Sequence, residues 1–158
     1  MNLKYNEDGC LLEGIYELSL NQIENEFVKG KSQRRRDIFD YYKIHLKDIK
    51  STGFCLNHWI DGSFVTKKEN PNDIDTLTEF DGVKIKELCI IDEIEHIIYD
   101  APLWSENFCH SFCVFKVPKN FGEDYGEYVE IKTKMLFCLF PVDYKNNKLK
   151  GFIKLKCD

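Results

Sequence analysis

Hydrophobic residues recur every three to four positions in two segments near the start of the 158-residue chain, and this spacing predicts two amphipathic helices. The first is expected to begin after Ser19, which forms a capping-box pattern with Gln22, and to end near Gly30. The second is expected to run from a Ser32 cap through Lys50. Both helices should place one apolar face against a common core.

The rest of the chain alternates between short apolar runs typical of strands and longer segments with helical periodicity. Turn residues separate these segments, and the dipeptide Asp81-Gly82 is a strong turn signal. The predicted elements are strands at 54–60, 73–80 and 109–117, helices at 84–98 and 124–140, and an exposed final strand at 149–156.

This order of elements predicts an α/β (α+β) fold class, with a small mixed β-sheet flanked by helices. The composition agrees, because 43% hydrophobic and 14% aromatic residues are enough to build one core at this length. No linker or repeat interrupts the pattern. Residues 1–158 are therefore expected to form a single domain.

The most specific chemical pattern lies between the first two predicted strands. Gly62-Ser63 ends one strand and, after nine intervening residues, Asp73-Ile74-Asp75 begins the next. Gly62 lets the backbone approach a ligand closely, and Ser63 is expected to cap a short helix whose N–H groups suit a phosphate. Asp73 and Asp75 share one strand face, about 6.6 Å apart along the backbone, where their carboxylates can bind divalent cations.

A structural interpretation of the same residues stays open. Asn-Pro-Asn-Asp is ordinary turn composition, so Asp73 and Asp75 could cap a turn in a plain α/β domain. The Gly-Ser turn at this spacing, with a strand before each element, favours a binding site instead. In such a site Lys67 or Lys68, from the intervening loop, is expected to neutralise phosphate charge.

The pattern resembles the signature of the nucleotidyltransferase (DNA polymerase beta-like) superfamily. The longer string WIDGSFVTKKENPNDID, with KGFIKL near the end of the chain, is similar to small bacterial proteins of unknown function of the DUF6932 type. The superfamily resemblance implies that Gly62 and Ser63 hold a nucleoside triphosphate. It also implies that Asp73 and Asp75 are catalytic and bind Mg²⁺ (or Mn²⁺).

The sequence departs from that superfamily at the third metal-binding acid, which usually comes from a neighbouring strand. The matching segment, 109–117, contains no acid, and the resemblance implies that His110 stands in the acid's place as a metal ligand. A neutral imidazole brings no negative charge, although it can ligate softer ions such as Mn²⁺ or Zn²⁺. Glu95 and Glu106 are the fallback acids.

Two functions follow from the resemblance. The first is Mg²⁺-dependent transfer of a nucleotidyl group from a nucleoside triphosphate to a hydroxyl of a protein or RNA. The alternative is a catalytically degenerate interaction protein of the same fold, antitoxin-like or defence-associated. Binding distinguishes the two, because a degenerate site should bind neither metal nor nucleotide tightly.

The net charge of −5 argues against a general nucleic-acid-binding surface. Five basic residues within 29–36 nevertheless form a local patch, which suits either a solvated helix face or a polyanionic partner such as RNA or an acidic protein.

The seven cysteines include no CxxC pair and no apolar signal segment precedes them, which predicts reduced thiols and a cytoplasmic location. Cys109, His110 and Cys113 do not suit a zinc site, because His110 faces away from the two thiols on a strand. No apolar run approaches the ~20 residues of a membrane span.

Overall fold

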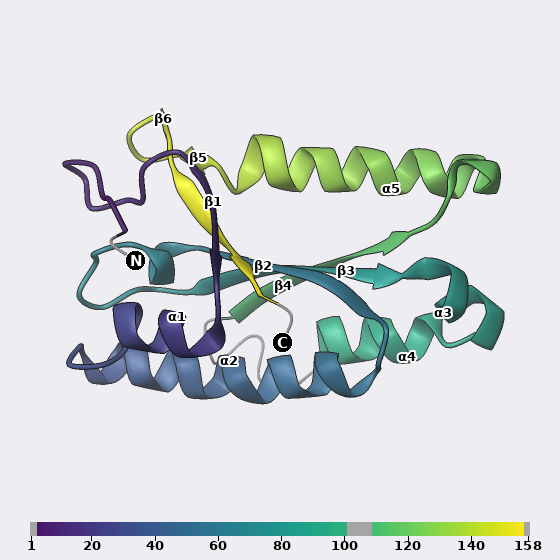
Figure 1. Ribbon diagram of the computed structural model, residues 1–158, viewed down its shortest axis with the longest axis horizontal. Coiled ribbons are helices and arrows are strands. Elements are labelled where there is room, and N and C mark those ends of the chain that lie inside the picture. Colours follow the sequence, from purple (N-terminus) through teal and green to yellow (C-terminus); the bar gives the residue numbers. More distant parts are fainter. Residues whose placement is uncertain (1–2, 101–108, 157–158) are drawn as a thin grey trace.

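The computed structural model describes residues 3–100 and 109–156, and in this part of the chain five strands form one mixed sheet (Figure 1). Strands β1 and β7 are parallel, as are β3 and β4, whereas β2 is antiparallel to both of its neighbours. The expected α/β (α+β) class with a small mixed sheet is confirmed. In spatial order the strands are β1 (Gly14–Leu18), β7 (Gly151–Leu155), β2 (Cys55–Asp61), β3 (Ile74–Asp81) and β4 (Cys109–Lys116).

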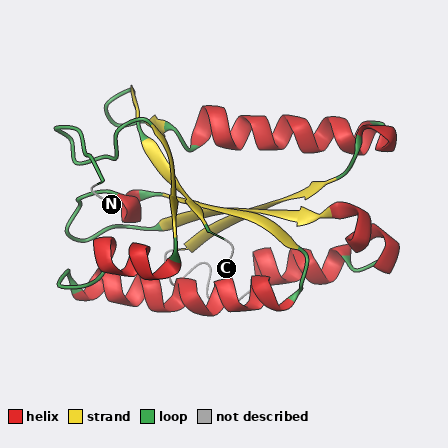
Figure 2. Cartoon of the chain, in the orientation of Figure 1, coloured by secondary structure: helices red, strands yellow, loops and turns green. Residues whose placement is uncertain are grey.

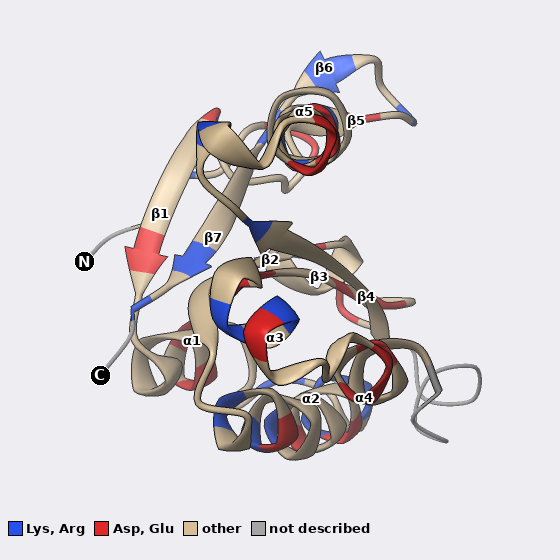
Figure 3. Ribbon diagram, turned by 90° about the vertical axis from the view of Figure 1, so that its right-hand side faces the viewer, with Lys and Arg blue, Asp and Glu red and all other residues tan. Residues whose placement is uncertain are grey.

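Helices cover both faces of this sheet (Figure 2). When the sheet is viewed along its edge, α1, α2 and α4 lie on one side and α5 lies alone on the other (Figure 3). A separate two-stranded hairpin, β5 (Val142–Asp143) and β6 (Lys148–Leu149), follows α5. The helices are α1 (Leu20–Phe27), α2 (Gln33–Ser51), α3 (Gly82–Leu88), α4 (Ile91–Glu95) and α5 (Glu123–Thr133).

The two predicted N-terminal helices are confirmed, with their caps. Ser19 and Gln22 form the expected capping box at the start of α1, and the Ser32 side chain accepts from the Arg35 N–H at the start of α2. Both helices bury apolar residues such as Ile23 and Ile38 against the sheet. None of the described helices is both long enough and apolar enough to cross a bilayer.

The single helix expected over 84–98 is wrong, because the chain forms two helices there. Asp81-Gly82 is not a free turn: the Asp81 side chain caps α3, and Gly82 packs directly against the backbone of β4. A left-handed residue, Cys89 (φ 55°), ends α3 before α4 begins. A π-helical turn, His96–Asp100, then extends α4, and another, Lys134–Leu139, similarly extends α5.

The expectation of an exposed final strand is also wrong. Strand β7 lies inside the sheet between β1 and β2, and Phe152, Ile153 and Leu155 are all buried. Strand β1, which the hydrophobic pattern did not predict, pairs with it in parallel. Gly151 permits this close approach, because a Cβ atom there would lie 2.3 Å from the carbonyl oxygen of Leu12.

Polar side chains are buried between α2 and the sheet. His45 Nε2 lies 2.9 Å from Ser111 Oγ, and His58 Nδ1 lies 2.9 Å from Thr78 Oγ1. Burial lowers the pKa of His45 to about 4 and the pKa of His58 to about 3. Both imidazoles are therefore neutral in the folded protein at pH 5, whereas in the unfolded chain they gain protons below pH ~6.5.

We predict that H58Q makes folding stability less sensitive to acid. Because the folded pKa of His58 lies below its unfolded pKa, its stabilising contribution is present above pH ~6.5 and is lost as the pH falls toward 3. Between pH 7 and pH 5 this loss is about 2 kcal/mol for one histidine. Urea unfolding at pH 7 and pH 5 measures the free energy of unfolding at each pH. The decrease from pH 7 to pH 5 should be about 2 kcal/mol smaller in H58Q than in the wild-type protein. Equal pH sensitivity of H58Q and the wild-type protein would contradict a neutral His58.

Candidate functional site

The register of three neighbouring strands places three polar side chains in one row. Asp61 of β2 lies opposite Asp75 of β3, and Asp75 lies opposite His110 of β4. Paired positions on adjacent strands point to the same face of a sheet, so these side chains share the face that α5 covers. Asp73 comes just before β3 and completes the group.

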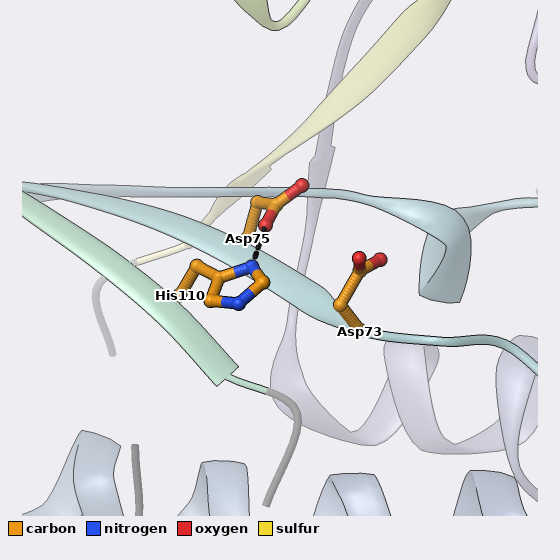
Figure 4. A group of neighbouring side chains, drawn as sticks. All are labelled: Asp73, Asp75 and His110. Atoms are coloured by element: carbon orange, nitrogen blue, oxygen red, sulfur yellow. Dashed lines mark hydrogen bonds and ion pairs between the residues drawn. The ribbon is translucent and has the colours of Figure 1, made fainter. Parts of the chain in front are cut away.

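Asp73, Asp75 and His110 converge, as the sequence analysis expected of metal ligands (Figure 4). Each offers a ligand atom, and these atoms all lie within 4.8 Å of one another. His110 Nδ1 lies 3.1 Å from Asp75 Oδ1, and the His110 side chain is 60% exposed. The cluster is therefore both compact and accessible from solvent. Within the described residues it is also the one such group of histidine, cysteine and acidic side chains, so neither Cys109 nor Cys113 joins it.

Gly62 allows β2 to turn closely beside the start of β3. Its backbone (φ 83°, ψ −174°) lies in a region that essentially only glycine adopts. A Cβ atom at this position would lie 2.9 Å from the Asp75 nitrogen and 3.0 Å from Asp75 Oδ2. Gly62 thus lies directly against Asp75 of the cluster, so the close approach at this position is to protein atoms.

Ser63 holds Asp73 in place. Its N–H and its hydroxyl both donate to Asp73 Oδ1, each at 3.0 Å, and its hydroxyl accepts from the Asn72 N–H at 2.7 Å. The expected Ser63 cap on a helix beginning at Phe64 is wrong: Ser63–Val65 is a single 3₁₀ turn without a side-chain cap. The hydroxyl bonds the start of β3 instead, ten residues further along the chain.

Lys67 and Lys68 are not brought to the cluster. Lys67 Nζ lies over the Tyr5 ring, 4.7 Å from its centroid, and Lys68 Nζ donates to Asn72 Oδ1 at 2.8 Å. Of the fallback acids, Glu95 lines a different pocket beside α4, and Glu106 lies outside the described residues.

The basic segment 29–36 is largely engaged within the protein. Arg35 is 3% exposed, and its guanidinium donates to the carbonyl oxygens of Phe27, Phe64, Thr66 and Lys68. Arg34 donates to the carbonyls of 71 and 72. These two arginines therefore fix the loop between Ser63 and Asp73, whereas Arg36 bonds the Lys31 carbonyl and the Gln33 side chain.

An ion pair that was not expected from the sequence lies beside the cluster. Lys150 Nζ contacts both carboxylate oxygens of Asp61, at 2.5 and 2.6 Å, and both residues are buried. The signal for Asp61 was an acid at the end of an otherwise apolar strand. Lys150 carried no such signal, because its alternation with apolar neighbours is typical of an exposed strand.

Carboxylates in this row have raised pKa values. Burial raises the pKa of Asp61 to about 7, although the Lys150 ammonium and the Gly62 N–H act in the opposite direction. Burial and the negative charge of Asp73 raise the pKa of Asp75, and its hydrogen bond to His110 partly offsets this. Crowded, desolvated acids with shifted pKa values are characteristic of functional sites.

The cluster opens into a pocket of about 390 Å³ with two chemically different ends. The polar end contains Asp73, the three side chains of the row and Lys150. The other end is formed by apolar residues of β4 and of the segment that follows α5. These apolar residues are Phe112, Met135, Leu139, Phe140 and Val142. Such a pocket suits a ligand with a charged part and an apolar part.

Residues 3–156 match the model of a family described as "Family of unknown function (DUF6932)". No curated protein and no solved structure matches the chain. The family description names no activity, so the chemistry of the site has to be inferred from its residues.

We predict that G62A is destabilising by about 3 kcal/mol, because alanine adds backbone strain and a contact with Asp75. The matched control is G53A: Gly53 also has a positive φ, but a Cβ atom added there would meet nothing within 4 Å. G53A should therefore cost only about 1 kcal/mol, the backbone strain alone. Urea unfolding of both variants measures the difference. Equal losses would show that Gly62 is not needed for close packing against β3.

Proposed function

We propose that this chain, which belongs to the DUF6932 family of unknown function, binds a nucleoside triphosphate with a divalent cation and transfers a nucleotidyl group to a hydroxyl of a protein or RNA. The observation that carries the proposal is the convergence of Asp73, Asp75 and His110 at the polar end of the pocket. The resemblance of Gly62-Ser63 and the paired aspartates to the nucleotidyltransferase signature supports it.

The donor set of the cluster fits a divalent cation. Ligand atoms about 2.1 Å from a common octahedral ion lie no more than about 4.2 Å apart, so the 4.8 Å limit of this cluster requires only small side-chain adjustments. Two carboxylates with one imidazole suit Mn²⁺ better than Mg²⁺, which prefers oxygen ligands. We therefore expect Mn²⁺ to be the more effective of the two ions.

Residues of the chain would position the reacting groups. A bound cation would offset phosphate charge and orient the attacking and leaving oxygens. Ser63 fixes the orientation of Asp73, and Gly62 keeps the turn against Asp75. Lys150 is the only lysine or arginine lining the pocket among the described residues, so it replaces Lys67 and Lys68 as the group that would face the phosphates.

The proposed reaction exchanges one phosphorus–oxygen bond for another. The acceptor oxygen bonds to the α-phosphorus, the bond from that phosphorus to the bridging oxygen of the β-phosphate breaks, and pyrophosphate leaves. The hydroxyl proton is released to water. Positioning and charge neutralisation account for most of the rate enhancement in phosphoryl-transfer chemistry, and this site offers both.

Two features favour the alternative, a degenerate interaction protein. The third acid of the superfamily pattern is replaced by His110, and both donors of Ser63 are used by Asp73, not left open for a phosphate. A protein of this second kind would release no pyrophosphate from any nucleoside triphosphate, whereas the leading proposal requires release in the presence of an acceptor.

We predict that 1 mM ATP with Mn²⁺ stabilises the wild-type protein by about 2.7 kcal/mol if the Kd is about 10 µM, and that D73N/D75N abolishes this stabilisation. Asparagine keeps an acceptor oxygen for the Ser63 N–H, so the variant should fold. Thermal melts with each of the four ribonucleoside triphosphates, with Mn²⁺ or Mg²⁺, measure the effect.

The matched control is D37N/D40N, which removes the same charge from two exposed aspartates of α2. This control should respond to nucleotide as wild type does. Absence of a metal-dependent shift with any of the triphosphates would reject nucleotide binding and favour the interaction protein. A shift of equal size in D73N/D75N would place the nucleotide elsewhere.

A further inference from the structure

The apolar end of the pocket begins one row of the sheet beyond the metal cluster. On β3 and β4 this row consists of Leu77 and Phe112, which follow Asp75 and His110 by two positions and so point to the same face. Leu77 is completely buried beneath residues of the segment after α5, whereas Phe112 is 40% exposed. One aromatic side chain thus remains partly uncovered directly beside the cluster.

Phe112 keeps part of its side chain exposed beside the residues that the structure describes. Among the described residues, no other aromatic ring stacks against it. Met135 and Leu139, from the π-helical turn after α5, line the same pocket. Phe112, Met135 and Leu139 therefore line one pocket together with His110. Two further aromatic residues, Phe140 and Tyr144, line it as well.

The spacing of the two rows matches the shape of a nucleotide. Two residues along a strand span about 6.6 Å. In a nucleotide the ribose separates the base from the α-phosphate by a distance of the same order. A nucleotide with its α-phosphate beside Asp75 and His110 would therefore bring its base to the level of Phe112.

We propose that Phe112 is the stacking platform for the base and the residue that makes this pocket select nucleotides over inorganic polyphosphates. This inference rests on the proposed function and names the part of the substrate that the apolar end recognises. Stacking uses the π-face that every base presents, so recognition of this kind tolerates all four bases. Tyr144 also lines the pocket, but it comes from the segment after α5 and not from the strand that carries His110.

Calorimetric titration with two probes tests the inference: ATP and inorganic tripolyphosphate, each with Mn²⁺. F112A should weaken ATP binding about tenfold, a typical loss for one stacked base, and leave the tripolyphosphate Kd unchanged. F112Y, which keeps an aromatic ring, should bind ATP within about twofold of wild type. F137A is the matched control, because Phe137 is 70% exposed and does not line the pocket.

The outcomes separate this inference from the proposed function. If ATP binding needs Asp73 and Asp75 but is unaffected by F112A, the base lies elsewhere and only the inference fails. The inference would also be overturned if F112A weakened the binding of ATP and of tripolyphosphate equally. It would be overturned as well if the wild-type protein bound the two probes with equal affinity. If wild type binds neither probe, both proposals fail. Should F112A not fold, F112L provides the same comparison, since it keeps apolar bulk without a ring.

Discussion

The pairing register of β2, β3 and β4 is the constraint on which the site depends. It places Asp61, Asp75 and His110 in one row, and the alternate residues Ile60, Thr76 and Ser111 are buried on the opposite face. A slip of one residue would send the polar row into the core beneath α2 and turn Ile60, Thr76 and Ser111 toward the pocket. The close contact of Gly62 with β3 opposes such a slip where the row lies.

Buried polar interactions hold the elements around this row. On the α2 face, Arg35 bonds the loop that joins Ser63 to Asp73. On the other face, the buried carboxylate of Glu79 accepts hydrogen bonds from Tyr128 and Lys132 of α5. The Arg35 contacts fix the loop that leads to Asp73. The Glu79 contacts fix α5, whose extension carries Met135 and Leu139 to the pocket. Removing one partner from such a buried network leaves an unsatisfied charge, so these contacts specify position strongly.

Sequence patterns predicted the fold class and the meeting of Asp73 with Asp75, because both follow from local signals, whereas His110 was expected there only from the resemblance. Helix caps, strand alternation and the Gly-Ser to Asp-x-Asp spacing act over short stretches of chain. The Lys150–Asp61 pair joins residues 89 positions apart, and it exists because β7 enters the sheet between β1 and β2. The position of β7 inside the sheet has no local signature in the sequence, so Lys150 was overlooked. The hydrogen bond from Ser63 to Asp73 has none either, so Ser63 was expected to cap a helix.

The most direct test of this account is the position of a cation in crystals grown with Mn²⁺ and a non-hydrolysable ATP analogue. The account predicts an anomalous difference peak bonded to Asp73, Asp75 and His110, with the analogue's phosphates beside it and Lys150 facing them. A site without such a peak, or with Mn²⁺ bound only elsewhere, would contradict the claim that this row of the sheet is a metal-dependent nucleotide site.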